Sequence, residues 1–238
     1  MKEFFAEFTK DFSQSFIEAD RWKLYLKGIG VTLQVTVMAL IMGLIIGLII
    51  SVVRCLHDQN PALRRNPLLK VANAICHIYT TVIRGTPMMV QLLIMYFVIF
   101  ASSRNQIMVA VIAFGINSGA YISEIVRGGI MSVDQGQMEA GRSIGLNYLQ
   151  TMRYIIIPQA LKSVLPSLGN ELITLLKETS IVTVIGLRDL TKAAMLIQGK
   201  TYQAFMPFIG VAMIYLILVL GLSYIMSRVE RRLRVDER

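Results

Sequence analysis

Long uninterrupted apolar segments dominate the pattern of hydrophobic and polar positions along this 238-residue chain. Residues 28–53 form a run of 26 without a charge, and residues 204–227 form another of 24. A helix of about 20 apolar residues crosses the hydrocarbon core of a bilayer, so each run is long enough to span it. Neither run has the polar stripe of a helix that covers a soluble core. The pattern therefore predicts an all-α membrane protein.

The same pattern predicts about five membrane-spanning segments within one domain, residues 24–228. Their approximate bounds are 26–53, 72–101, 105–126, 164–187 and 204–227. The second segment is interrupted at Arg84-Gly85-Thr86-Pro87, and we expect its lipid-crossing part to be residues 85–103. The longest polar connection, residues 127–162, joins the third and fourth segments. Glycine pairs at 43/47 and 115/119 are typical of helices that cross closely.

The first 23 residues are polar but carry phenylalanines at helical spacing. We expect residues 1–23 to form an amphipathic helix in the membrane interface, with its aromatic face in lipid and with Trp22 and Tyr25 at the headgroup level. A short soluble cap helix is the alternative. The phenylalanines are Phe4, Phe5, Phe8, Phe12 and Phe16.

The net charge of +9 is explained by the membrane rather than by nucleic acid. Lys and Arg collect in cytoplasmic loops of membrane proteins, and no basic patch here is interleaved with aromatic residues. Connections 54–70 and 127–162 and the tail hold 13 Lys and Arg residues, against eight on the other side. This bias predicts an outside N-terminus and a cytoplasmic C-terminus, with residues 229–238 as a basic cytoplasmic tail.

Patterns for catalysis and metal binding are weak. Cys55 and Cys76 are expected to be unpaired thiols, and with the two histidines they form no metal-ligand spacing. A membrane-embedded enzyme would need facing His, Asp or Ser groups, and neither histidine has a partner at a suitable spacing. Residues 194–201 approximate a phosphate-binding loop, but they lie between two spans rather than between a strand and a helix. We therefore expect no catalytic residue, metal or cofactor in this chain.

Residues 139–158 form the most informative polar segment. Glu139-Ala140-Gly141 is followed after three residues by Gly145, and after nine more by an apolar run that ends at Pro158. We interpret this as a stub of small helical residues, a glycine able to take a left-handed turn, and an apolar run stopped by proline. Such a loop can form a short helix that lies across the membrane face. Its side chains are small, so they would not prevent it from docking into a groove of a partner protein. It indicates a cytoplasmic interaction loop, with a plain amphipathic connector as the alternative.

This segment resembles the EAA loop of ATP-binding-cassette (ABC) importer permeases. That pattern reads Glu-Ala-Ala, three residues, Gly, nine residues, then Ile-x-Leu-Pro; here Gly141 replaces the second Ala and Ile157 replaces Leu. Further phrases extend the likeness over residues 20–228, and together they resemble the polar amino acid permeases of the histidine, glutamine and arginine type. The phrases are IRGTPMMVQL (83–92), GAYISEIVRGGI (119–130), GQMEAGRSIGL (136–146) and LGNELITLLKETSIVTVIGL (168–187).

The resemblance implies a permease subunit of the bacterial plasma (inner) membrane that moves polar L-amino acids by alternating access. It implies three partners: a second permease copy or a paralogue, a cytoplasmic ATPase dimer that binds ATP and Mg, and an extracytoplasmic amino acid-binding protein. ATP hydrolysis then belongs to the partner. A membrane scaffold or receptor anchor that passes no solute is the alternative function. The residues that would couple the chain to the ATPase are Glu139, Ala140, Gly141, Gly145 and Pro158.

Polar side chains inside the third and fourth spans have two interpretations, because an ionised group at mid-bilayer must be paired or wet. Either they line a solute path or they pair with one another and hold helices together. We assign to the path Asn117, Ser118, Tyr121, Glu171, Thr174 and Glu178. Arg84, Glu124 and Lys177 we assign to structural pairing, with Glu178 as a further partner. The carboxylate of Glu171 weakly favours a cationic substrate, although it would equally hold the α-ammonium of any amino acid.

Overall fold

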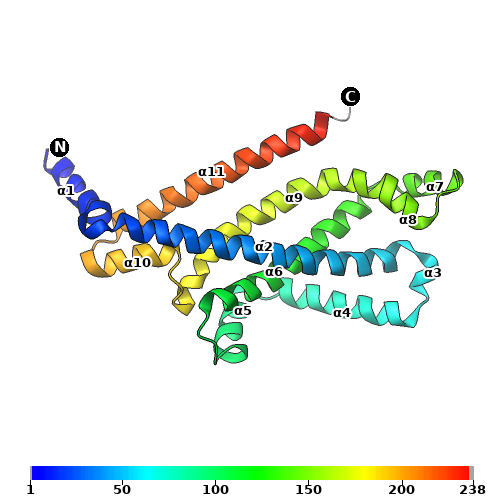
Figure 1. Ribbon diagram of the computed structural model, residues 1–238, viewed down its shortest axis with the longest axis horizontal. Helices are drawn as coiled ribbons and strands as arrows, with labels where there is room; N and C mark the ends of the chain where they lie inside the picture. The colour runs from blue at the N-terminus through cyan, green and yellow to red at the C-terminus, as the bar shows by residue number, and fades with distance from the viewer. Residues whose placement is uncertain (1, 236–238) are drawn as a thin grey trace.

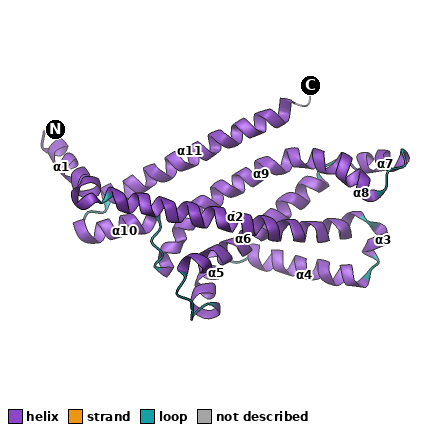
Figure 2. Ribbon diagram, in the orientation of Figure 1, coloured by secondary structure: helices purple, strands orange, loops and turns teal. Residues whose placement is uncertain are grey.

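Helices make up all the regular structure of residues 2–235, which are the residues that the computed structural model describes (Figure 2). The predicted all-α membrane fold is confirmed. Residues 236–238 of the predicted tail lie outside the described residues. The α-helices are α1 (Lys2–Phe12), α2 (Trp22–Gln59), α3 (Pro61–Arg64), α4 (Pro67–Arg84), α5 (Met88–Ile94), α6 (Gln106–Met131), α7 (Gln135–Ser143), α8 (Tyr148–Thr151), α9 (Ile157–Glu178), α10 (Leu190–Thr201) and α11 (Phe205–Val235).

The long helices run roughly along one axis and leave short helices at its two ends (Figure 1). α1 and α10 lie at one end, beside the N-terminus, whereas α3, α7 and α8 lie at the other. The C-terminus points toward the end that holds α7. The loop predicted to face a cytoplasmic partner is therefore separated from the N-terminus by the length of the bundle.

Among the described residues, three helices are long and apolar enough to cross a membrane, namely α2, α6 and residues 205–232 of α11, and a bent pair would make a fourth. Five spans were expected. α9 is not in this set; it carries Glu171, Lys177 and Glu178. The bent pair corrects the second predicted span, since α4 and residues 88–99 meet at 105°. Residues 85–103 are thus not one crossing helix. Pro87 lacks an N–H and disfavours helical geometry at the preceding residue, so the helix ends before it and a new helix begins after it.

α2 and α6 form the most extensive helix pair of the bundle. A Cβ added at Gly47 would lie 2.6 Å from Cγ2 of Ile122, and one added at Gly119 would lie 2.9 Å from Cγ2 of Ile46. Only glycine allows the two backbones to come this close, so the predicted close crossing is confirmed. α2 also continues to Gln59, well past its predicted end at residue 53.

The N-terminal segment is not the single helix expected over residues 1–23. α1 is followed by a π turn (Ser13–Ile17) and a 3-10 turn (Glu18–Asp20) before α2 begins. The ring of Phe16 stacks on Tyr25 at 5.2 Å and would touch a Cβ placed at Gly210. Tyr25 is only 3% exposed and does not reach the headgroup level as expected, whereas Phe16 is half-buried and Trp22 is exposed. The side chains of Phe5, Phe8 and Phe12 are exposed, and the side chain of Phe4 lies outside those described.

Candidate functional site

The predicted coupling segment begins with a capped helix that ends in a glycine turn. The side chain of Asp134 accepts a hydrogen bond from the Gly136 amide (2.7 Å) and caps α7. At the other end Gly145 has φ +89°, its amide donates to the Arg142 carbonyl (3.0 Å), and the Leu146 amide donates to the Gly141 carbonyl (3.1 Å). This pair of bonds is a Schellman motif, which needs a left-handed residue and so favours glycine. The predicted left-handed turn at Gly145 is confirmed.

The connection from α7 to α9 folds back through α8. Asn147 and Gln150 form a capping box at the start of α8, with both side chain-to-amide bonds at 2.9 Å. A π turn (Met152–Ile156) follows, and α9 then begins with Pro158 in its first turn. The prediction that Pro158 stops the apolar run is wrong. Pro158 instead follows directly on the π turn, in helical backbone that is continuous from Tyr148 to Glu178.

Gly141 holds α7 against α8. It is buried, whereas Glu139, Ala140 and Gly145 are exposed. A Cβ at position 141 would lie 2.5 Å from Cγ2 of Thr151 and 2.9 Å from its Oγ1. The Glu139 side of α7 is therefore exposed, and the Gly141 side forms the seam with the segment that leads into α9.

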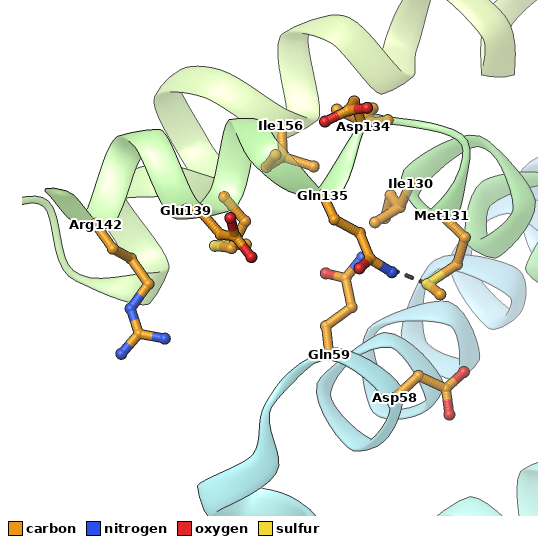
Figure 3. A pocket seen from close by; sticks show the side chains of 11 residues that line it. Asp58, Gln59, Ile130, Met131, Asp134, Gln135, Glu139, Arg142 and Ile156 are labelled. Carbon is orange, nitrogen blue, oxygen red and sulfur yellow. Dashed lines mark hydrogen bonds between the residues drawn. The ribbon is translucent and has the colours of Figure 1, made fainter.

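A groove of about 370 Å³ separates α7 from the ends of α2 and α6 (Figure 3). Asp58 and Gln59 of α2 line one wall, and Glu139 and Arg142 of α7 line the other. Nε2 of Gln59 lies 3.4 Å from the sulfur of Met131, at the end of α6. Our reading of the sequence missed the α2 wall because it assigned residues 54–70 to a linker. The helical spacing of Arg54 and Asp58 was the signal that the helix continues.

Two adjacent residues of the predicted solute path make buried contacts. Ser118 is 1% exposed, and its Oγ donates to Oε1 of Glu171 at 2.7 Å. Nδ2 of Asn117 donates to Oε1 of Gln91 at 3.0 Å. Gln91 is a polar residue that we did not predict for the path. Its Nε2 donates to the carbonyls of Ile83 (2.7 Å) and Thr86 (3.1 Å), which the break in the helix leaves without intrahelical partners.

The other predicted path residues are not joined to these pairs by hydrogen bonds within the described part of the chain. Tyr121 lies under the guanidinium of Arg84, with 5.3 Å between the Arg84 Cζ and the ring centre. Thr174 is exposed, and Glu178 is half-buried. The structure thus brings together Asn117, Ser118 and Glu171 with Gln91, and leaves Tyr121, Thr174 and Glu178 around them.

Glu124 does not pair with Arg84 or Lys177 as predicted, and no ion pair among the described residues joins Arg84, Lys177 and Glu178. The carboxylate of Glu124 instead contacts Arg54 of α2 and pairs with Arg127 at 3.1 Å. Arg84 and Lys177 are exposed in the single chain rather than buried. Arg54 reaches Glu124 because α2 runs beyond its close crossing with α6, a consequence of tertiary packing that spacing along the chain does not reveal.

A buried carboxylate at the opposite end also escaped our sequence analysis. Asp189 is fully buried, caps α10, and accepts hydrogen bonds from the amides of Thr191 (3.0 Å) and Lys192 (2.9 Å). Burial raises the pKa of this carboxyl group, and the two amide donors act in the opposite direction. A Cβ at Gly28 would lie 2.8 Å from the Leu190 Cα, so α10 is seated directly on α2.

The described residues offer little for a metal or nucleotide. No group of three or more His, Cys, Asp and Glu side chains among them is placed to hold a metal ion. Residues 194–201, which approximate a phosphate-binding loop in sequence, are part of α10. A helix interior keeps its amides in intrahelical bonds, so this segment has no cradle of free amides for a phosphate.

Comparisons with known proteins agree on one family. The family model described as "binding-protein-dependent transport system inner membrane component" matches residues 66–235. An arginine transport system permease protein of Bacillus subtilis is 43% identical over 166 residues, which cover 68% of this chain and 76% of that protein. A glutamine transport system permease protein of Escherichia coli K12 is 41% identical over 169 residues, which cover 69% of this chain and 77% of that protein.

Solved structures give the same result. The crystal structure of an amino acid ABC transporter with histidines has a chain that matches with a TM-score of 0.79 and 42% identity, covering 88% of this chain and 94% of that one. An inward-facing structure of the MetNI methionine ABC transporter matches with a TM-score of 0.76 at 21% identity, covering 92% and 99%, and supports the fold alone. The resemblance seen in the sequence is confirmed: the chain belongs to the family of inner membrane components of binding-protein-dependent transport systems.

Proposed function

We propose that this chain is the permease subunit of an ABC importer and that it carries polar L-amino acids across the bacterial plasma membrane. The observation that carries this proposal is the α7–α8 unit, whose outer side is exposed and whose seam at Gly141 is rigidly packed. Such a unit is built to receive force from a docked partner. The amino acid substrate is supported by the relatives named above, whose printed activities concern arginine and glutamine.

Coupling follows from how α7 is attached to the bundle. Residues 132–134 connect it to α6, and α8 with the following turn connects it to α9, so a displacement of α7 acts on both helices. The proposed partners are a cytoplasmic ATPase dimer that binds ATP and Mg, a second permease copy or paralogue, and an extracytoplasmic binding protein. Closure of the ATPase dimer would draw two α7 helices together and open the path outward, and hydrolysis would return it inward. Glu139 would face basic side chains or backbone donors of the ATPase.

The two buried polar pairs suit the two charged groups of an amino acid. We assign Glu171 to the substrate ammonium, and the amides of Asn117 and Gln91 to its carboxylate. In the single chain these groups satisfy one another through Ser118–Glu171 and Asn117–Gln91, which avoids the cost of unpaired polar groups in an apolar surrounding. A passing substrate would take over these bonds. A cationic side chain is a further possible partner for Glu171, so arginine is the first cationic substrate to test.

The orientation in the membrane is also a proposal. The bias of Lys and Arg residues supports a cytoplasmic α7, α8 and C-terminus, with α1, α10 and the N-terminus outside. Figure 1 is compatible with this topology, because these two sets of elements lie at opposite ends of the bundle.

The test is uptake by proteoliposomes that contain the permease, its ATPase and the binding protein. Wild type and Glu171→Gln are compared for arginine, glutamine and cystine, with the same change at the exposed Glu7 of α1, Glu7→Gln, as a control. Equal loss of all three substrates in Glu171→Gln assigns the carboxylate to the ammonium or to folding, and selective loss of arginine supports a cationic substrate. Uptake without the ATPase would contradict an ABC importer. Failure of the complete complex to move any of the three would favour the scaffold alternative.

A further inference from the structure

We infer that four charged side chains form an ionic clamp that makes α2, α4 and α6 move as one body when α7 is displaced. The ionic clamp consists of Arg54 and Asp58 on α2 and Glu124 and Arg127 on α6. This inference rests on the proposed function and assigns positioning residues for the transport cycle.

The ionic clamp is a continuous chain of contacts across three helices. Arg54 contacts Glu124, Arg127 pairs with Glu124 at 3.1 Å, and Arg127 reaches Asp58 at 3.4 Å. Arg54 also donates to Oγ1 of Thr80 at 3.3 Å, which brings in α4. Glu124 is therefore shared by two arginines, and each helix contributes at least one polar group.

The ionic clamp lies just beyond the point where glycine packing ends. The close crossing of α2 and α6 has its last tight glycine contact between Gly47 and Ile122. From there toward α7 no further glycine of α2 meets α6, and Arg54–Glu124 and Asp58–Arg127 tie the helices together about two and three turns further along α2. Apolar packing alone would leave this end of α6 less firmly held to α2 than the crossing itself.

Force on α7 enters α6 at this same end. α6 ends at Met131, one turn after Arg127, and α7 begins at Gln135. The groove of Figure 3 separates α7 from α2, and Asp58 belongs both to that groove and to the ionic clamp. The ionic clamp is thus the polar link by which a displaced α6 end pulls α2 with it. Without it, α7 would move the end of α6 away from α2, and closure of the ATPase dimer would no longer open the path efficiently.

Partial burial makes these contacts stronger than ordinary surface pairs. The side chains of Arg54 and Glu124 are 11% and 19% exposed and those of Arg127 and Asp58 are 29% and 32% exposed. Lys23, at the start of α2, and Asp20, just before it, are 53% and 60% exposed. When one partner of a buried ion pair is removed, the other charge stays away from water without a partner, and this destabilises the fold. Exposed ion pairs contribute little to the free energy of folding. The Lys23–Asp20 pair is therefore an exposed control pair at the far end of α2.

The experiment measures amino acid transported per ATP hydrolysed in proteoliposomes that contain the complete transporter. Arg127→Gln, Asp58→Asn and the double variant are compared with wild type, with Arg127→Lys as the conservative rescue and Lys23→Gln with Asp20→Asn as the control. We expect the ratio to fall by roughly tenfold in the first three, a typical size for coupling between sites, while ATP hydrolysis stays near wild type. The double variant should be no worse than Arg127→Gln, because that change already removes the Asp58–Arg127 pair together with the Arg127–Glu124 pair. Arg127→Lys and the control should keep the wild-type ratio.

An unchanged ratio in all variants would overturn the inference. So would a parallel fall of uptake and hydrolysis that follows a lower yield of assembled complex, since that result describes a purely structural role. If the wild-type complex itself shows no ATP-driven uptake, the proposed function fails, which is distinguishable from failure of the ionic clamp alone.

Discussion

Replacement of Gly141 by alanine should weaken the coupling unit, although it restores the residue that the EAA pattern has at this position. The added methyl group would lie 2.5 Å from Cγ2 of Thr151 and 3.1 Å from Cδ1 of Ile155. The isoleucine atom is the end of a flexible side chain and can move. Thr151 cannot turn away easily, because it is fully buried, β-branched and held by a 3.0 Å hydrogen bond from its hydroxyl to the Asn147 carbonyl.

Two opposing terms determine the size of the effect. Forcing a methyl group into a filled site costs about 1–3 kcal/mol of folding free energy. Alanine in place of glycine inside a helix returns about 1 kcal/mol. The net loss for Gly141→Ala is therefore about 0–2 kcal/mol, and we expect the upper part of that range because the obstructing group is rigid. Thr151→Ser removes Cγ2 but keeps the hydroxyl, whose oxygen would still lie 2.9 Å from the added methyl group, so it should recover part of the loss when combined with Gly141→Ala.

The assay is thermal unfolding of the purified permease–ATPase complex, together with ATPase stimulation by the liganded binding protein. Gly141→Ala should lower the Tm and the stimulation, Thr151→Ser alone should change them little, and the double variant should return toward wild type. The reasoning is refuted if Gly141→Ala is as stable as wild type. It is also refuted if the effects of the two changes simply add, because contact between the two side chains requires them to interact.

Further predictions concern the glycine turn, the topology and the N-terminal helix. Gly145→Ala should weaken ATPase binding, because a non-glycine residue at positive φ costs about 1–2 kcal/mol of conformational free energy. Gly199→Ala, at a helical glycine with open space around it, should leave binding unchanged. Equal binding by both variants would exclude a role for the turn. In a cysteine-free background, Lys200→Cys should react with an impermeant maleimide added to intact cells and Gln137→Cys should not; the reverse result would invert the topology. With the only tryptophan replaced by phenylalanine, Phe8→Trp should be quenched by lipids brominated near the headgroup, and quenching by aqueous iodide instead would place α1 away from lipid.

Much of this protein follows from local sequence. The uncharged runs at 28–53 and 204–227 identify a membrane protein, because the ability of a helix to span the bilayer depends on its length and polarity. The Gly145 turn was predictable because the preference for glycine at positive φ is a property of one residue. Glycines at 43/47 and 115/119 indicated a close crossing, and the structure places these two sets against each other.

Tertiary structure decided which charged residues pair and at what angles the helices meet. Arg54 pairs with Glu124, 70 residues away, because α2 and α6 cross closely and continue side by side, whereas the sequence suggested Arg84 and Lys177 as partners. Pro87 signalled a break, but its 105° bend and the capping of its free carbonyls by Gln91 depend on how α5 packs on α6. The physical reason is that a helix's length and its glycine turns are set by neighbours along the chain. Which charged group it meets depends on helix rotation and crossing geometry, which arise only when the whole bundle packs.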